Sequence, residues 1–205
     1  MRIEKFQAAV ALLYAGSVLM AVQLTKRLFT VDDFYRMVDA GILHEKDRVE
    51  LIEGEVLAMS PIGSPHGAAV DRANRALVNA AGERAIVRVQ GSVRLDRYNQ
   101  PQPDVVLLRP KKDFYATKHP GPLDILLIVE VAQSFIEYDK TIKARIYART
   151  GVVEYWVADI DQDCVLVYSN PSKDGYRSLR QLVRGESISP ELLPQCRIAI
   201  DSLLP

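Results

Sequence analysis

The sequence predicts a domain of the α/β or α+β class, because strand-like and helix-like segments alternate along a chain that can bury a sizeable core. Of its 205 residues, 48% are apolar and 25% are charged, a composition typical of a folded globular protein. No internal repeat, low-complexity tract or linker divides the chain. We therefore expect one domain over residues 25–205.

The net charge and the cysteine content exclude several classes of protein. The 26 basic and 26 acidic residues cancel, which argues against a nucleic-acid binder that relies on a positive field over the whole molecule. The two cysteines, Cys164 and Cys196, rule out a disulfide scaffold and a four-cysteine zinc site. So few thiols favour a reducing compartment, and we expect a cytoplasmic protein.

Residues 1–24 are expected to lie outside the folded domain. An apolar run from Ala8 to Val22 follows a basic start, as in a signal peptide, but the cleavage pattern is poor and the run is short for a membrane span. Three interpretations stay open: a helical extension or upstream start ahead of Met20, a secretory signal, and a membrane or partner anchor. No stable membrane association is expected unless this segment is an anchor.

Capping and turn residues place the first elements. A capping-box pattern predicts a short helix over residues 30–40. The segment 48–60 is typical of two short strands joined at Glu53-Gly54. A second helix is expected over residues 64–82, with Ser64 as its N-cap and apolar residues at a 3.6-residue period.

Strand patterns dominate the second half of the chain. Several segments alternate apolar and polar side chains or are almost wholly apolar, as half-buried and fully buried strands are. An amphipathic helix is expected over residues 139–149. The expected strand segments are 85–89, 92–96, 104–108, 124–131, a hairpin over 153–169, and peripheral strands at 175–183 and 196–200.

One carboxylate lies where a strand should be covered on both faces. The run from Ile125 to Val131 is almost continuously apolar, yet it contains Glu130. A buried carboxylate is costly unless it is paired, protonated or bound to a metal. Glu130 therefore either pairs with a basic group from a neighbouring element or belongs to a functional site.

A second carboxylate has a matching context. Asp104 opens an apolar strand directly after Pro103 and precedes Glu130 by 26 residues (130 − 104), enough for a strand, a loop and a return strand. Adjacent strands lie about 4.8 Å apart, so two such carboxylates could share one hard cation. Oxygen ligands with open water positions favour Mg²⁺, and the sequence supplies no His/Cys set for zinc.

A basic group that could serve this site lies on the helix that follows Glu130. Lys143 is one helical turn after Asp139 and one before Tyr147, so the three side chains share a face. That face could turn back over the strand ends. Tyr138, Asp139 and Tyr147 are expected to shape and pack the helix rather than to perform chemistry.

These residues lie in blocks that resemble a large bacterial family of putative restriction endonucleases. The family belongs to the PD-(D/E)xK nuclease superfamily and was long labelled a domain of unknown function. The matching blocks are RVELIEGEVLAMSPIGSPH (48–66), SVRLDRYNQPQPDVVLLRP (92–110) with its PD pair (103–104), IVEVA (128–132) and YDKTIKARIYARTGVVEYWVAD (138–159). The resemblance implies a restriction-endonuclease-like core, with a mixed central sheet flanked by helices and an extra C-terminal β-hairpin region.

The resemblance also implies a metal-dependent phosphodiesterase centre. Asp104 and Glu130 would bind Mg²⁺ or Mn²⁺, with the Val131 carbonyl as a further ligand. The superfamily lysine usually stands two residues after the Glu, where this chain has Ala132. In this family a lysine of the following helix takes over, and Lys143 occupies that place. It would orient the attacking water or stabilise negative charge in the transition state.

Four further residues are auxiliary candidates. Gln102 could hydrogen-bond a metal-bound water, Glu50 and Glu55 could each add a carboxylate, and His66 could contact a phosphate or a metal-bound water. Each has an ordinary alternative as a loop, strand-edge or helix-entry residue. At position 133, relatives are expected to carry an acidic residue. This chain has the uncharged Gln133 instead, so an accessory role in metal binding is not favoured there.

DNA is the substrate that the resemblance implies, and a homodimer would most naturally cut both strands. Clusters of basic residues usually lie on the solvated surface, so their presence is compatible with DNA binding but is not evidence for it. The neutral net charge predicts weak, salt-sensitive binding. The basic residues that could form a local rim are Lys111, Lys112, Lys118, Lys140, Arg145, Arg94 and Arg97.

The leading hypothesis is a Mg²⁺-dependent endonuclease that acts on DNA. The first alternative is a catalytically degenerate nuclease fold that binds nucleic acid or a protein partner without cleavage, which Ala132 and the neutral charge leave open. The second is a metal-dependent enzyme that acts on another phosphorylated substrate.

Overall fold

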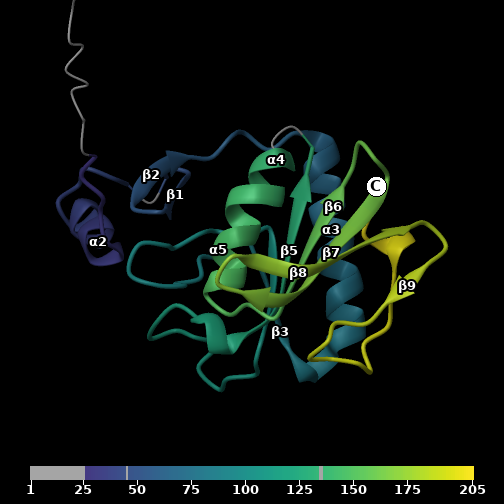
Figure 1. Cartoon of the computed structure of the whole chain (residues 1–205). Coiled ribbons are helices and arrows are strands. Elements are labelled where there is room, and N and C mark those ends of the chain that lie inside the picture. Colours follow the sequence, from purple (N-terminus) through teal and green to yellow (C-terminus); the bar gives the residue numbers. More distant parts are fainter. Residues whose placement is uncertain (1–25, 45, 134–135) are drawn as a thin grey trace, which may run out of the picture.

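The computed structural model describes residues 26–44, 46–133 and 136–205 (Figure 1). The expectations about residues 1–24 therefore concern a segment outside the described residues. Within the described part of the chain, no helix has the length and apolar character needed to cross a bilayer.

A mixed six-stranded sheet forms the centre of the described residues, in the order β3-β4-β5-β6-β7-β8. The β5–β6 pair is parallel and the other neighbours are antiparallel. This agrees with the predicted mixed sheet. The strands are β3 (Ile86–Val89), β4 (Val105–Leu108), β5 (Ile125–Ala132), β6 (Glu154–Asp159), β7 (Cys164–Ser172) and β8 (Gly175–Val183).

The remaining elements cover the sheet or extend from it. Two short hairpins add β1 (Val49–Ile52) with β2 (Glu55–Ala58), and β9 (Ser187–Ile188) with β10 (Ile198–Ala199). The helices are α2 (Val31–Asp39), α3 (Ser64–Ala81), α4 (Ile136–Tyr138), the π-helical turn η3 (Asp139–Lys143), α5 (Ala144–Arg149) and the short 3₁₀ turns η1 (Gly82–Arg84), η2 (Pro122–Asp124) and η4 (Ile200–Ser202).

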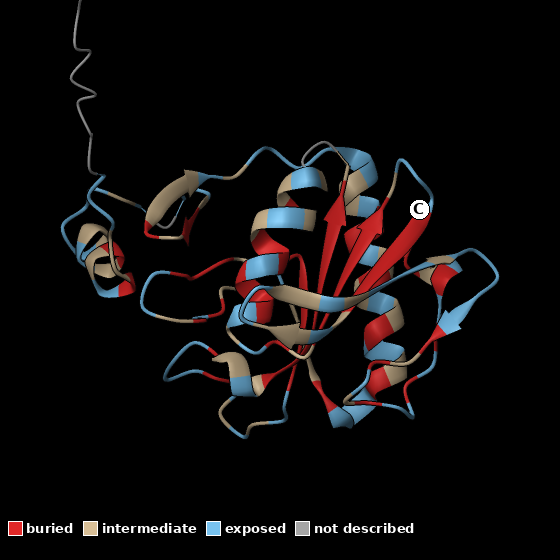
Figure 2. Cartoon of the chain, in the orientation of Figure 1, coloured by how far each residue is buried: buried red, intermediate tan, exposed pale blue. Residues whose placement is uncertain are grey.

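The core has two layers because both faces of the sheet are covered (Figure 2). On one face, Val105 and Leu107 of β4 pack with α3 and the C-terminal segment. On the other face, the alternate residues Val106 and Leu108 pack with α5. A strand covered on both sides needs apolar residues at every position, which explains the continuous apolar runs in β4 and β5.

A small N-terminal unit of α2 and the β1–β2 hairpin adjoins the sheet. The predicted capping box is present, since the Thr30 hydroxyl accepts a hydrogen bond from the Asp33 backbone and the Asp33 carboxylate accepts one from Thr30. The predicted hairpin turn has positive φ at Glu53 and Gly54, 50° and 77°. Leu51 of β1 bridges to Gln100, and this contact ties the hairpin to the segment that leads into β4.

Two local predictions are wrong. Residues 92–96 form no strand. Their backbone amides bind carbonyls of loop segments instead: Val93 binds Pro101 and Leu95 binds Asn99, because the chain turns back before the PD pair, and Arg94 binds Pro120. The second prediction concerns the cap of α3. Its N-cap is Gly63, one residue earlier than expected, and Ser64 is the first helical residue.

Candidate active site

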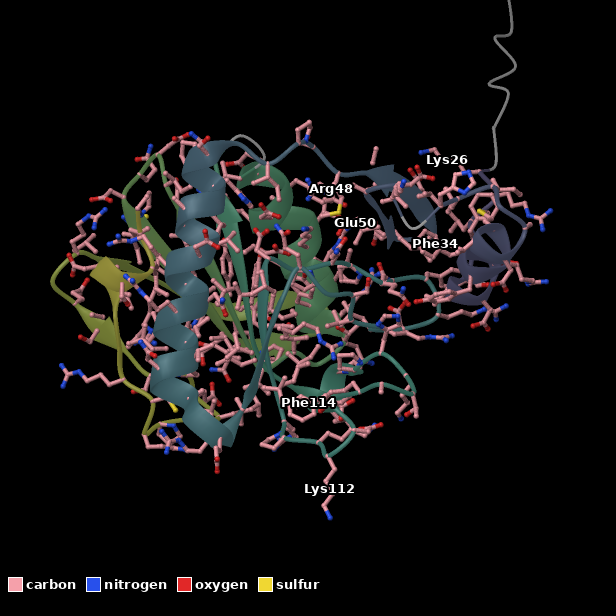
Figure 3. All side chains as sticks on the ribbon, turned by 180° about the vertical axis from the view of Figure 1, so that it is seen from behind. Lys26, Phe34, Arg48, Glu50, Lys112 and Phe114 are labelled. Atoms are coloured by element: carbon pink, nitrogen blue, oxygen red, sulfur yellow. The ribbon has the colours of Figure 1, made fainter. Side chains whose placement is uncertain are left out.

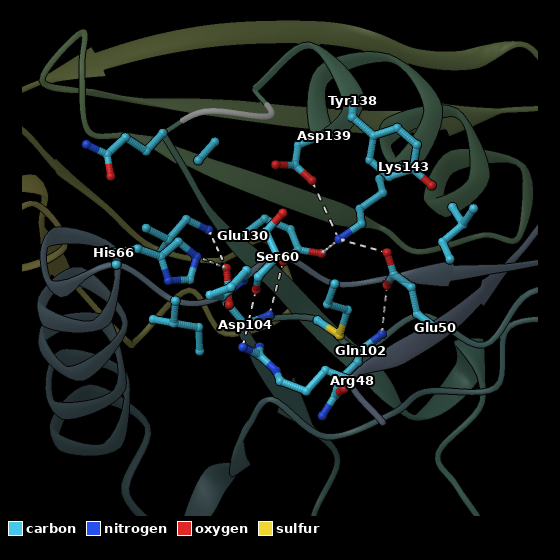
Figure 4. A pocket seen from close by; sticks show the side chains of 18 of the residues that line it. Arg48, Glu50, Ser60, His66, Gln102, Asp104, Glu130, Tyr138, Asp139 and Lys143 are labelled. Atoms are coloured by element: carbon cyan, nitrogen blue, oxygen red, sulfur yellow. Dashed lines mark hydrogen bonds and ion pairs between the residues drawn. The ribbon is translucent and has the colours of Figure 1, made fainter. Parts of the chain in front are cut away.

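Asp104 and Glu130 lie opposite each other on adjacent strands. Val105 of β4 pairs with Val129 of β5 in antiparallel register, so the preceding Asp104 faces the following Glu130. The Asp104 backbone N–H donates to Glu130 Oε2 at 3.0 Å, and the Val131 N–H donates to Asp104 Oδ2 at 3.0 Å. Both side chains are buried (Figure 4). The register therefore brings together the two carboxylates that the sequence singled out.

The amine of Lys143 contacts the carboxylate of Glu130 and does not point into bulk solvent. Its Nζ is 3.0 Å from Glu130 Oε1, 3.6 Å from Asp139 Oδ1 and 3.8 Å from Glu50 Oε1. Asp139 and Lys143 stand at the two ends of η3, and a π-helical turn often marks a functional site. Burial alone would lower the pKa of Lys143, but the neighbouring carboxylates outweigh it and hold that pKa well above its usual value.

Tyr147 also contacts the carboxylate of Glu130. Its hydroxyl donates to Glu130 Oε1 at 2.9 Å, and its ring packs on Tyr155 with centroids 4.9 Å apart. The expected packing role is therefore present together with a polar contact that the sequence did not predict. Its position four residues after Lys143, on the same helix face, was the available signal.

His66 reaches Asp104 from the first turns of α3. Its Nε2 lies 3.0 Å from Asp104 Oδ2, and this bond raises the pKa of His66. Burial disfavours the charged form of Asp104, but the bonds from His66 and from the Val131 N–H lower its pKa overall. Gln90, which the sequence did not single out, donates to Asp104 Oδ1 at 3.4 Å.

The other auxiliary candidates have different positions. Glu50 is buried in the site and accepts a hydrogen bond from the Gln102 backbone at 3.3 Å. The side-chain amide of Gln102 is already engaged, since it donates to the Gln90 carbonyl. Glu55 lies outside the site, where its half-exposed carboxylate pairs with Lys26 at 2.9 Å.

A cavity of about 420 Å³ lies between the β1–β2 hairpin, the start of α3, the end of β5 and the helical segment from α4 to η3. Its lining includes Glu50, His66, Gln102, Asp104, Glu130, Asp139 and Lys143. Among the described residues, four buried carboxylates line it (Glu50, Asp104, Glu130 and Asp139), together with one buried lysine. Burial, which outweighs the attraction of Lys143, raises the pKa of Glu130 to about 8 and that of Asp139 to about 6. The cavity thus holds more acidic groups than its lysine can neutralise.

The predicted basic rim is not assembled at this cavity. The basic groups that are paired bind other carboxylates: Arg94 binds Asp32 at 2.8 Å, Lys111 binds Asp113 at 3.1 Å, Lys140 binds Asp159 at 3.4 Å, and Arg145 binds Glu53 at 3.4 Å. Figure 3 shows Lys112 at the opposite end of the molecule from Arg48 and Glu50. The residues that line the cavity do not include Lys111, Lys112, Lys118, Lys140, Arg145, Arg94 or Arg97.

The donor set fits a hard divalent cation that keeps water ligands. Within the described ranges, no group of three or more His, Cys, Asp and Glu side chains is placed to hold a metal ion. Two carboxylates suffice for Mg²⁺, which usually retains several waters. Asp104 Oδ1 and Glu130 Oε2 each accept a single hydrogen bond, so each keeps a lone pair. Both oxygens and the excess of acidic groups are consistent with Mg²⁺ or Mn²⁺.

The mixed six-stranded sheet, with paired carboxylates at the ends of β4 and β5, is consistent with a restriction-endonuclease-like fold of the PD-(D/E)xK type. Residues 31–201 match the Uma2 family, described as "Putative restriction endonuclease", and the chain belongs to this family. No curated protein sequence matches the chain. It is also similar to the crystal structure of a putative nuclease of DUF820 from Anabaena variabilis. The TM-score is 0.65 at 16% identity, over 85% of this chain and 97% of that one.

Proposed function

We propose that this protein is a metal-dependent endonuclease that hydrolyses phosphodiester bonds of DNA. The observation that carries the proposal is the pairing of Asp104 with Glu130, with the Lys143 amine 3.0 Å from Glu130. Membership of a family described as a restriction endonuclease supports the reaction class. Lys143 supplies the lysine that is missing at Ala132.

Asp104 and Glu130 would hold the cation, with the Val131 carbonyl as a third protein ligand. A bound Mg²⁺ or Mn²⁺ would polarise the scissile phosphate and lower the pKa of a water ligand. The high pKa of Lys143 keeps its amine protonated, so it would donate hydrogen bonds to developing negative charge rather than accept a proton. Tyr147 and His66 would hold the two carboxylates in orientation through their bonds to Glu130 and Asp104.

We further propose that a homodimer cuts duplex DNA, each protomer acting on one strand. Sedimentation equilibrium of the full chain, with and without a short duplex, tests this assembly. A protein that stays monomeric while it makes double-strand breaks would contradict it.

Cleavage of supercoiled plasmid and of labelled duplex oligonucleotides, with Mg²⁺ or Mn²⁺, tests the activity. Asp104→Ala should abolish cleavage, and Lys143→Ala should slow it about 10²- to 10³-fold, as expected for loss of one transition-state donor. Glu55→Ala is the control, because it removes a carboxylate that lies outside the cavity, where it pairs with Lys26. Cleavage that survives Asp104→Ala would assign the activity to another site or to a contaminant.

A second candidate is a protein of this fold that binds DNA without cutting it. Ala132 at the usual lysine position favours it, as does the engagement of Lys143 by three carboxylates. It predicts DNA binding by the wild-type protein without Asp104-dependent cleavage, whichever metal is supplied.

A further inference from the structure

The basic groups that line the cavity are not equivalent. Lys143 is buried among carboxylates, and His66 is bonded to Asp104. Arg48 also lines the cavity, but it is exposed and makes no ion pair with any of the described residues. Arg48 is therefore the arginine at this cavity whose charge is still available to a ligand.

Local structure holds Arg48 in place. Its carbonyl accepts a hydrogen bond from the Met59 N–H at 2.8 Å, which extends the β1–β2 hairpin by one pair. Its guanidinium Nη1 donates to the Ser60 carbonyl at 3.3 Å. A guanidinium has five N–H donors, so this single bond leaves most of them free.

The position of Arg48 follows from the period of the strand. Arg48 precedes Glu50 by two residues, and side chains two apart in extended backbone lie on the same face. The hairpin therefore brings a carboxylate to the buried part of the cavity and a guanidinium to its exposed edge. In Figure 4, Arg48 lies across the cavity from Asp139 and Lys143, with Asp104 and Glu130 between them.

A phosphodiester that approached this cavity would meet buried carboxylates whose lysine is already engaged. Beside the metal ion proposed at these carboxylates, a side-chain cation that has not been neutralised would hold the DNA backbone, and the planar guanidinium fork matches two phosphate oxygens at once. We propose that Arg48 binds the non-bridging oxygens of a DNA phosphate at the mouth of the cavity. This inference rests on the proposed function and names a substrate-binding residue for that site.

Binding measurements test the contact apart from catalysis. A cleavage-deficient Asp104→Asn protein and a short fluorescein-labelled duplex give Kd by anisotropy over a range of salt concentrations. Arg48→Met in that background should weaken binding about ten- to hundredfold, as for loss of a charge-assisted hydrogen bond. The slope of log Kd against log salt should fall by about 0.9, because one phosphate contact is lost. Arg48→Lys should give an intermediate Kd, since it keeps the charge but not the fork.

Arg84→Met is the matched control. Arg84 lies just beyond the C-terminal end of α3, the end opposite to His66, and its guanidinium also donates to one backbone carbonyl, that of Ala80 at 2.9 Å. Arg84→Met removes the same charge and should leave both Kd and the salt slope close to those of the parent. Thermal unfolding of both variants would separate a binding defect from a folding defect.

The outcomes distinguish the two proposals. Equal effects of Arg48→Met and Arg84→Met would overturn the assignment of Arg48, even in an enzyme with full Asp104-dependent cleavage. Absence of such cleavage in the wild-type protein would overturn the proposed reaction. The Kd values measured by anisotropy would still show whether Arg48 contacts a DNA phosphate. A parent protein that binds no DNA would contradict both.

Discussion

Replacing Lys143 with Met should destabilise the metal-free protein severely. The substitution keeps the length and the apolar stem of the side chain but removes the amine that lies 3.0 Å from Glu130 and 3.6 Å from Asp139. Removing one partner of a buried ion pair costs about 3–5 kcal/mol, because the remaining charge has no compensation. For a domain of this size, 1 kcal/mol shifts Tm by about 2–4 °C, so the loss corresponds to about 6–20 °C.

The pH dependence of that loss has a definite sign. Burial raises the folded-state pKa of Asp139 to about 6 and that of Glu130 to about 8, so protonation favours the folded protein at each group. Below about pH 6 both carboxyls are already protonated in the folded wild-type protein. Without Lys143 they would hold their protons to a higher pH. The stability deficit of the variant should therefore grow as the pH rises from 6 to above 8.

Urea unfolding in a chelating buffer measures this deficit. The single tryptophan, Trp156, is fully buried and reports the transition by fluorescence. Lys140→Met is the comparison, because its amine lies 3.4 Å from the buried carboxylate of Asp159 but is itself partly exposed, so water can replace part of the contact and the loss should be smaller. Adding Glu130→Gln to Lys143→Met should restore much of the stability. A loss at pH 8 no larger than that of Lys140→Met would refute the reasoning.

Three other outcomes are expected. Tyr147→Phe should lower the free energy of unfolding, measured with urea, by about 1.5–3 kcal/mol, since it removes a buried hydrogen bond to the Glu130 carboxylate. An unchanged free energy of unfolding would show that this bond does not stabilise the fold. Mg²⁺ at 100 times its Kd should add about 2.7 kcal/mol to the free energy of unfolding and so raise Tm, and Asp104→Asn should abolish this shift. Equal shifts in both proteins would mean that the metal binds at another site. Gly54→Ala should destabilise more than Gly185→Ala. Both glycines have positive φ (77° and 86°), but a Cβ at Gly54 would lie 2.7 Å from another side chain and one at Gly185 meets open space; similar losses would contradict this steric argument.

The apolar patterns in the sequence predict where strands form better than they predict which segments pair with each other. The apolar runs predict β4 and β5 correctly, because full burial on two faces needs apolar residues at every position. Residues 92–96 show the strand alternation as clearly, yet their amides bind Asn99, Pro101 and Pro120 in a loop. Alternation indicates which side of the backbone a residue takes, and it does not indicate whether a neighbouring strand is present.

The same limit applies to the site. Asp104 and Glu130 could be singled out because a carboxylate in an apolar strand is energetically unusual. Gln90 and Arg48 carry no such signal, since Gln and Arg are ordinary at their positions along the chain. Only the packing of β3 beside β4 brings Gln90 to Asp104, and only the packing of the hairpin brings Arg48 to the cavity.

The amino-acid order alone determined the class of fold, the carboxylates that are costly to bury and the helix face that carries Lys143, because these depend on local periodicity and on desolvation. The tertiary structure decided which charges meet. It left Glu55 and the expected basic rim outside the cavity, and it brought Glu50 and the helix face of Asp139, Lys143 and Tyr147 to Glu130. Electrostatic and hydrogen-bond energies depend on distances of a few ångströms between distant parts of the chain, and those distances exist only after packing.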